Sequence, residues 1–115
     1  MFYLNKNNKY MILLREFNEE SKIDRIWYDS SMIVYSECYD NPNSPLKELS
    51  VTFKNGATYK YLDVDVNDYV MFVHGGIDDS NGKALNKHIK PKYECLRLEN
   101  KNIALLKEEL ENKRK

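Results

Sequence analysis

The chain has 115 residues and a mass of 13.7 kDa, which is the size of a single domain. Its 18 basic and 18 acidic side chains cancel, which excludes a protein that attracts polyanions over its whole surface. Hydrophobic residues make up 42% and charged residues 31%, a composition typical of a folded domain rather than of a disordered chain.

Several features of the chain bear on where it works. The longest aliphatic run covers residues 11–14, far short of the ~20 residues that a membrane-spanning helix needs. The first nine residues lack the apolar stretch and cleavage site of a secretory signal. Cys38 and Cys95 lie far apart and form no Cys-x-x-Cys motif, so we expect two unpaired thiols. These features predict a cytoplasmic protein without membrane contact.

Two short apolar runs, residues 9–17 and 22–28, flank a polar tetrad at residues 18–21. Periodicity alone is compatible with either a hairpin or one helix. The enrichment in Ile, Tyr, Trp and Phe, together with the turn-like tetrad, favours two strands.

A meander of three strands is predicted next. Residues 32–39 alternate as a strand, with Val34, Ser36 and Cys38 on one face. Residues 40–45 end it, because they combine turn formers with two prolines. Strands over residues 47–54 and 57–62 follow, joined at Asn55-Gly56, the strongest hairpin signal in the chain.

The register of this last hairpin can be predicted from the side chains that it would bury. A two-residue turn places Lys60 opposite Val51 and buries an ammonium, which costs several kcal/mol when unpaired. A three-residue turn, with Gly56 in the left-handed conformation, instead pairs Val51 with Tyr59 and puts Tyr59 and Tyr61 on the core face. We therefore expect the three-residue turn.

Three helices are predicted after these strands. The first covers residues 66–74, with Asp65 or Asn67 as its N-cap and Gly75-Gly76 as its stop. The second runs from an N-cap at Ser80 to residue 89. The third, residues 102–113, is amphipathic. The predicted core consists of Val34, Leu49, Val51, Phe53, Tyr59, Tyr61, Val66, Tyr69, Val70, Val73, Leu85 and Ile89.

No candidate pattern in the chain matches a known motif for catalysis or metal binding. Residues 63–74 imitate the start of a calcium loop but have Asp68 in place of the glycine and His74 in place of the bidentate glutamate. The two histidines and two cysteines show no zinc-ligand spacing, and nothing places a base beside a nucleophile. We expect no enzyme activity, no catalytic residue, no metal and no cofactor.

The charge is unevenly distributed along the chain. Residues 63–79 carry a net charge of −5, and residues 83–97 carry +4. One interpretation is that two solvated faces partly neutralise each other. The other is an anion-binding surface, in which lysines on one helical face contact phosphates and Tyr93 stacks on a base. The residues of that candidate site are Lys83, Asn86, Lys87, Lys90, Tyr93 and Arg97.

An ordered set of motifs covers residues 30–97. They are Ser30-Ser31, Leu49-x-Val51-x-Phe53-x-x-Gly56, Tyr59-x-Tyr61 and Ser80-x-Gly82-x-x-x-Asn86-x-x-Ile89-x-x-x-Tyr93-x-x-x-Arg97. This set resembles the KTSC domain, named for the C-terminal region of some lysyl-tRNA synthetases and also found in stand-alone bacterial and phage proteins. Val64-Asp65 stands where that family tends to have Val-Pro, a departure that concerns loop detail.

Together these features predict an α+β protein: a small antiparallel meander, two short helices packed on it and a C-terminal amphipathic helix. Residues 1–29 would be an N-terminal extension, 30–97 the KTSC-like domain with signature aromatics Tyr59 and Tyr61, and 98–115 the C-terminal helix. The resemblance also implies a cytoplasmic location, in a bacterial cell or a phage-infected host.

Two functional hypotheses follow. In the first, the protein is a non-enzymatic module that binds RNA or a nucleotide-like anion, an activity suggested by the synthetase context of the resemblance. In the second, it is a small phage or mobile-element protein that self-associates or inhibits a host defence factor, with the KTSC core as scaffold. Its C-terminal helix would then contact a protein partner through Ile103, Leu106 and Leu110.

Overall fold

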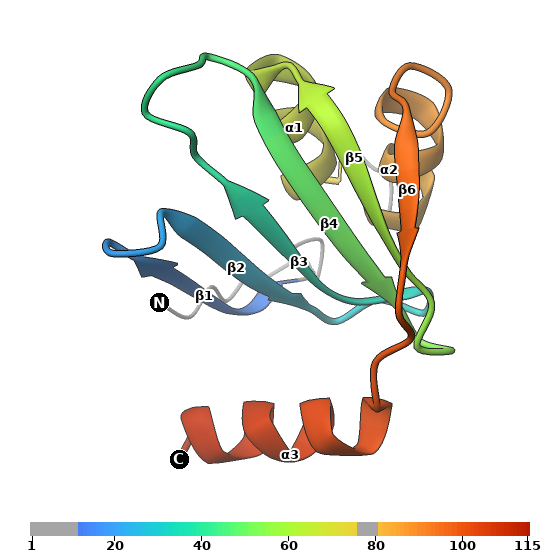
Figure 1. The fold of residues 1–115 in the computed structure, drawn as a ribbon. Coiled ribbons are helices and arrows are strands. Elements are labelled where there is room, and N and C mark those ends of the chain that lie inside the picture. Colours follow the sequence, from blue (N-terminus) through green and yellow to red (C-terminus); the bar gives the residue numbers. More distant parts are fainter. Residues whose placement is uncertain (1–11, 76–80) are drawn as a thin grey trace.

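The computed structural model describes residues 12–75 and 81–115. Within these ranges the chain forms an antiparallel sheet and helices, which confirms the α+β class (Figure 1). The elements in chain order are β1 (Ile12–Asn18), β2 (Ile23–Tyr28), β3 (Ile33–Tyr39), β4 (Lys47–Phe53), β5 (Thr58–Val64), α1 (Val66–Val73), α2 (Asn81–His88), β6 (Cys95–Leu98) and α3 (Ile103–Lys113). The predicted N-cap at Ser80 lies outside the described residues.

The strands are ordered β1-β2-β3-β4-β5-β6, so each pairs with its neighbour in the chain. The first two form a hairpin, which confirms the interpretation of that segment as strands, although residues 9–11 of the predicted first strand lie outside the described residues. Asn18 shapes its turn, because its side-chain oxygen accepts hydrogen bonds from the backbone N–H groups of Glu20 and Ser21. The sequence reading missed β6, a strand of four residues that pairs with β5.

The predicted register of the β4–β5 hairpin is confirmed. Gly56 adopts a left-handed φ of 92°, and its N–H donates to the carbonyl of Phe53 at 2.9 Å. Val51 lies opposite Tyr59, as the three-residue turn requires. Tyr61 is buried on the core face, whereas Tyr59 is half-buried.

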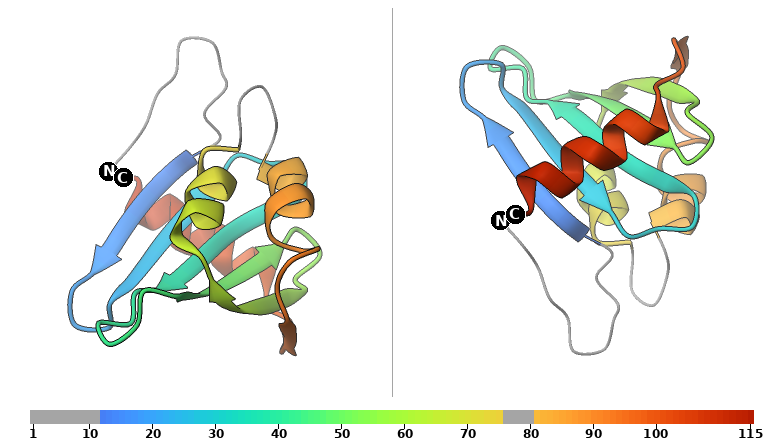
Figure 2. Two further views of the ribbon diagram at one scale, coloured as in Figure 1. Left: turned by 90° about the horizontal axis from the view of Figure 1, so that it is seen from above. Right: turned by 90° about the horizontal axis from the view of Figure 1, so that it is seen from below.

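Helices α1 and α2 cover one face of the sheet, and α3 crosses the other (Figure 2). Most of the predicted core lies between the sheet and the first two helices. Two members of the predicted set are wrong: Val66 and Val70 are 45% and 44% exposed. The inner side of α1 carries Tyr69, Phe72 and Val73 instead. An eight-residue helix with six apolar residues offers two stripes, and burial of the larger Phe72 side chain decides between them.

A bulge in β3 changes which face its first residues occupy. Ile33 pairs with Phe53 and Tyr35 with Thr52, so Val34 is an extra residue in the ladder. Ile33 joins the core beneath α1 and α2, while Val34 joins Trp27 and Tyr35 on the α3 face. The prediction that Val34 shares a face with Ser36 and Cys38 is therefore wrong, because alternation fails at a bulge.

Candidate functional site

Helix α2 presents its lysines to solvent because its other side is fastened to the protein. The buried amide of Asn81 donates to the carbonyls of Phe72 and Val73, at 2.7 and 3.1 Å, and so joins the start of α2 to the end of α1. Gly82 packs so closely on Met32 that an added Cβ would lie 2.5 Å from the sulfur. The exposed side then carries three of the predicted site residues: Lys83, Asn86 and Lys87.

Two further predicted residues sit on aromatic rings. The ammonium of Lys90 lies 5.4 Å from the ring centre of Phe53, and the guanidinium carbon of Arg97 lies 5.1 Å from that of Tyr59. The two rings touch edge to face, with their centres 6.0 Å apart. Strand β6 makes the contact between Arg97 and Tyr59 possible, because it places the two residues directly opposite each other. We call these four residues the cation–aromatic cluster.

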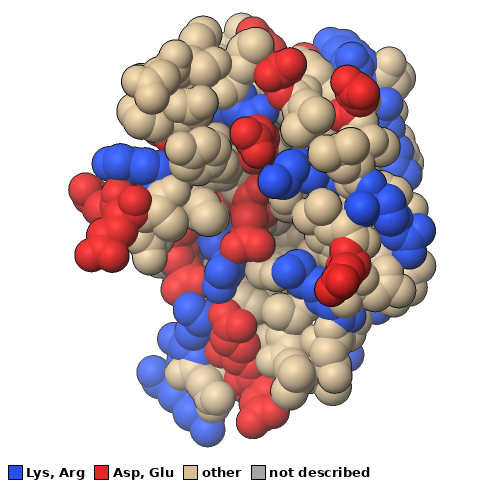
Figure 3. All heavy atoms as spheres, viewed as in Figure 1, with Lys and Arg blue, Asp and Glu red and all other residues tan. Residues whose placement is uncertain are grey.

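Three cations of this region, Lys87, Lys90 and Arg97, have no carboxylate counterion among the described residues. Arg97 donates hydrogen bonds to the Tyr59 hydroxyl and to the side-chain oxygen of Asn100, both at 3.0 Å and both neutral. Among residues 12–75 and 81–115, no carboxylate oxygen lies within 4.0 Å of a side-chain nitrogen of Lys87, Lys90 or Arg97. In Figure 3, blue side chains gather on the right-hand side, where Figure 1 shows α2 and β6. This basic edge consists of the exposed side of α2, Lys90 and β6.

Tyr93 is placed differently from the other predicted site residues. Its hydroxyl donates to the carboxylate of Asp68 on α1 and accepts the backbone N–H of Asp65, while its ring packs on the core. The hydrogen bond from Tyr93, helped by Lys92 at 3.1 Å, lowers the pKa of Asp68. Burial and that same carboxylate raise the pKa of Tyr93. Tyr93 thus links α1 to the segment before β6, and base stacking by its ring stays a prediction.

The Lys92–Asp68 ion pair also bears on the two interpretations of the charge pattern. It joins the acidic segment to the basic segment at one point, as the solvated-face interpretation expects. The cations of the cation–aromatic cluster take no part in it. Sequence reasoning missed Phe53 and Tyr59 as partners of these cations, because the Arg97–Tyr59 contact depends on β6 and the Lys90–Phe53 contact joins residues far apart in the chain.

The three apolar residues predicted as an interface on α3 lie against this chain's own sheet. Ile103, Leu106 and Leu110 are half-buried on the cluster of Trp27, Val34 and Tyr35. Two ion pairs add to the attachment, Arg25 with Glu109 at 3.0 Å and Lys113 with Glu16 at 2.9 Å. A role of this helix face in binding a partner stays a prediction.

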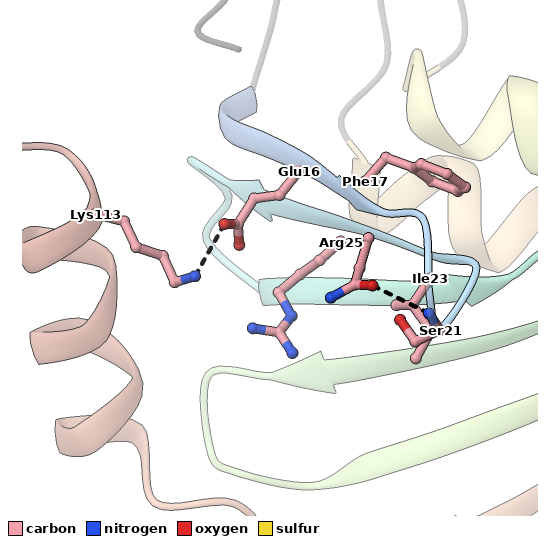
Figure 4. Close-up of a pocket in the computed structure, with 7 residues that line it drawn as sticks. Glu16, Phe17, Ser21, Ile23, Arg25 and Lys113 are labelled. Atoms are coloured by element: carbon pink, nitrogen blue, oxygen red, sulfur yellow. Dashed lines mark hydrogen bonds and ion pairs between the residues drawn. The ribbon is translucent and has the colours of Figure 1, made fainter.

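A pocket of about 220 Å³ opens beside the end of α3 (Figure 4). Lys113 reaches from α3 toward Glu16, and the Phe17 ring points away from both. Arg25, the other cation of the pocket, is held by Glu37 and Glu109. These charges are already paired with one another. The pocket therefore marks the boundary between α3 and the sheet and has, among the described residues, no unpaired charge with which to bind a ligand.

A second pocket, of about 430 Å³, lies between α1 and the first strands on the opposite face. Asp24 accepts two hydrogen bonds from Arg15, at 3.1 and 2.7 Å, and one from the Tyr69 hydroxyl at 3.0 Å. Cys38 also lines it, and burial raises the pKa of this thiol to about 12. A thiol with that pKa stays protonated near neutral pH and is a poor nucleophile.

Two properties of the described residues bear on other classes of function. No group of three or more potential metal ligands comes together there. No helix in the same ranges has the length and apolar character to cross a bilayer. Both cysteines are free thiols, Cys38 buried and Cys95 exposed.

Comparison with known proteins gives one family match. The model of the KTSC domain matches residues 19–93. A search of the curated proteins found no match. The matched range includes β2 to α2 and most of the predicted site, but it ends before β6 and α3. Arg97 therefore lies outside it.

Proposed function

The chain belongs to the KTSC domain family, and from that premise we propose that it is a non-enzymatic module that binds RNA, or another phosphate-bearing ligand, through its basic edge. One observation carries the proposal: Lys90 and Arg97 are held over Phe53 and Tyr59 with no described carboxylate beside them. A phosphate can therefore contact cations that are already positioned and have no described carboxylate competing for them.

The geometry also supports a particular mode of binding. A ring that carries a cation on its accessible face is not free to stack on a base, so contacts through Lys90 and Arg97 would be made to phosphates. Phosphate contacts position a nucleic acid but do not read its sequence. We therefore expect affinity that depends steeply on salt and weakly on sequence.

The test is the binding of a fluorescently labelled single-stranded RNA, followed by fluorescence polarisation at increasing KCl concentration. We expect the logarithm of the association constant to fall linearly with the logarithm of the KCl concentration. Lys87→Glu should weaken binding roughly ten-fold at low salt, because it replaces an attraction to phosphate with a repulsion. Arg97→Ala should weaken it and flatten the salt dependence.

Lys107→Glu is the matched control, since it makes the same charge change on the exposed side of α3. If Lys107→Glu and Lys87→Glu weaken binding equally, the attraction comes from overall charge and the basic edge is not the site. Affinity that stays flat from low to high salt would rule out phosphate binding altogether. Replacing the RNA with inorganic phosphate or a mononucleotide separates polymer binding from binding of a small anion.

A further inference from the structure

An exposed apolar patch lies around the larger pocket. Phe17 on β1 and Val66 and Val70 on α1 line the pocket, and they are 50%, 45% and 44% exposed. Buried members of the pocket, Cys38 and Tyr69, belong to the core beneath. The three exposed residues come from segments far apart in the sequence, so the tertiary fold brings them together.

Helix α1 exposes apolar side chains in addition to those that it buries. Its inner side buries Tyr69, Phe72 and Val73, while Val66, Val70 and Met71 are exposed on the outer side. A helix that faces water normally carries polar residues there. Exposed apolar side chains that gather around a pocket with charged residues mark a surface that binds another protein.

The charged residues of this pocket are balanced. Arg15 pairs with Asp24, and Lys47 pairs with Asp40 at 2.9 Å. The patch thus combines apolar residues with two cations and two anions. A partner of strong net charge would gain little electrostatic attraction from such a surface. A second surface of the same composition could bind to it without net repulsion.

We propose that this patch is the contact between two copies of the chain, related by a two-fold axis. A two-fold interface brings one surface against itself, so the surface must be complementary to itself. Balanced charges around an apolar centre meet that condition, because the Lys47–Asp40 ion pair of each copy can face the same pair of the other copy in the opposite orientation while the valines pack together. The patch made by Phe17, Val66 and Val70 is the centre of this contact, and Asp40 and Lys47 lie among its charged residues.

This contact is separate from the basic edge. Lys47 begins β4 and Phe53 ends it, so the two sites lie at opposite ends of one strand, roughly 20 Å apart. Two copies joined through the patch would leave both basic edges free. The inference stands whether or not the protein binds RNA.

The first experiment measures the mass of the protein in solution by sedimentation velocity over a range of concentrations. We expect wild type to shift from monomer to dimer as concentration rises. Val70→Glu should remain monomeric throughout, because it places a carboxylate at the apolar centre. Leu105→Glu is the control: Leu105 is 61% exposed on α3, on the other face of the sheet, and this change should leave dimerisation intact.

The second experiment reverses one charge at a time. Asp40→Lys leaves three cations and one anion in the pocket, and Lys47→Asp leaves one cation and three anions. Each variant alone should repel itself and stay monomeric at low salt. An equimolar mixture of the two should form a heterodimer, because their pockets now carry opposite charge. A partner other than a second copy would not produce this rescue.

Three results would overturn the proposal. One is a monomer at every concentration, which would leave the patch to solvent or to a different protein. Another is a dimer that Leu105→Glu disrupts and Val70→Glu does not. The last is dimerisation of Asp40→Lys and Lys47→Asp separately with the wild-type affinity at low salt. Urea unfolding of each variant confirms that the chain is folded, which the exposure of Val70 and Asp40 leads us to expect.

Discussion

Helices α1 and α2 bury Phe72 and Leu85 completely against one face of the sheet, whereas α3 lies on the other face without burying any of its residues. The first face holds a large continuous core, whereas the buried apolar cluster on the second face consists, among the described residues, of Trp27, Val34 and Tyr35. The same sheet is thus covered once by close packing and once by half-buried contacts and ion pairs.

This difference indicates where stability comes from. Each large apolar side chain that is fully buried stabilises the fold by roughly 2 kcal/mol, and the face covered by α1 and α2 has many of them. The ion pairs of α3 involve groups that are 31–41% exposed, and such pairs contribute at most about 1 kcal/mol each. The KTSC match contains α1 and α2 but not α3. We therefore expect α3 to be a weakly attached cover.

The largest effect should come from removing a side chain on the well-packed face. Phe72→Ala leaves a cavity beside Tyr28, whose ring centre lies 5.7 Å from that of Phe72. The expected loss is about 3–5 kcal/mol in the free energy of unfolding, measured by urea denaturation. Leu105→Ala on α3 should change it by less than about 0.5 kcal/mol. A similar loss in both variants would contradict the contrast between the faces.

A smaller loss should follow from Gly56→Ala, at the point where the β4–β5 turn meets the segment before α3. The φ of 92° disfavours any Cβ, and a Cβ built there would lie 2.7 Å from the carbonyl oxygen of Lys101. We expect a loss of roughly 1–3 kcal/mol in urea denaturation. Gly56→Asn tolerates the positive φ better but keeps the contact. If Asn restores full stability, the close approach to Lys101 is unimportant.

Loosening α3 alone should have little effect on global stability. Glu109→Lys replaces the attraction to Arg25 and Lys113 with repulsion, and we expect a loss below about 1 kcal/mol. Amide hydrogen exchange within α3 should nevertheless become faster, while exchange in α1 stays unchanged. Glu108→Lys makes the same charge change at an exposed neighbouring position and is the control. Faster exchange in α1 as well would mean that the two faces unfold together.

The smallest effect concerns the contact between α1 and Tyr93. Because the pKa of Asp68 is lowered in the folded protein, its contribution to stability is present above its unfolded pKa of about 4 and is lost as pH falls through the folded pKa. The urea midpoint of wild type should fall as the pH is lowered from about 5 to about 2. Asp68→Asn should make this fall smaller, because the variant has no carboxylate to protonate at this position. Asp63→Asn, at an exposed carboxylate in β5, is the control. Identical pH profiles for wild type and Asp68→Asn would refute the coupling.

Much of the fold could be predicted because it depends on residues that are close together in the chain. The three-residue turn at Gly56 follows from local conformation and from the cost of burying Lys60, and it determines the hairpin register. Asp65, one of the two predicted caps, begins α1 by accepting a hydrogen bond from the backbone N–H of Asn67, two residues away. These elements were recognisable since both partners of each contact lie within one short segment.

Other features depended on partners that are distant in the sequence. Strand β6 has four mostly exposed residues and becomes a strand by pairing with β5, which also brings Arg97 to Tyr59. The bulge at Val34 and the inner side of α1 were decided by which side chains fill the core best. The sequence alone determined the turns, the cap of α1 and the family. The tertiary structure alone decided which side chains meet at the surface, because edge pairing and packing are properties of the assembled chain.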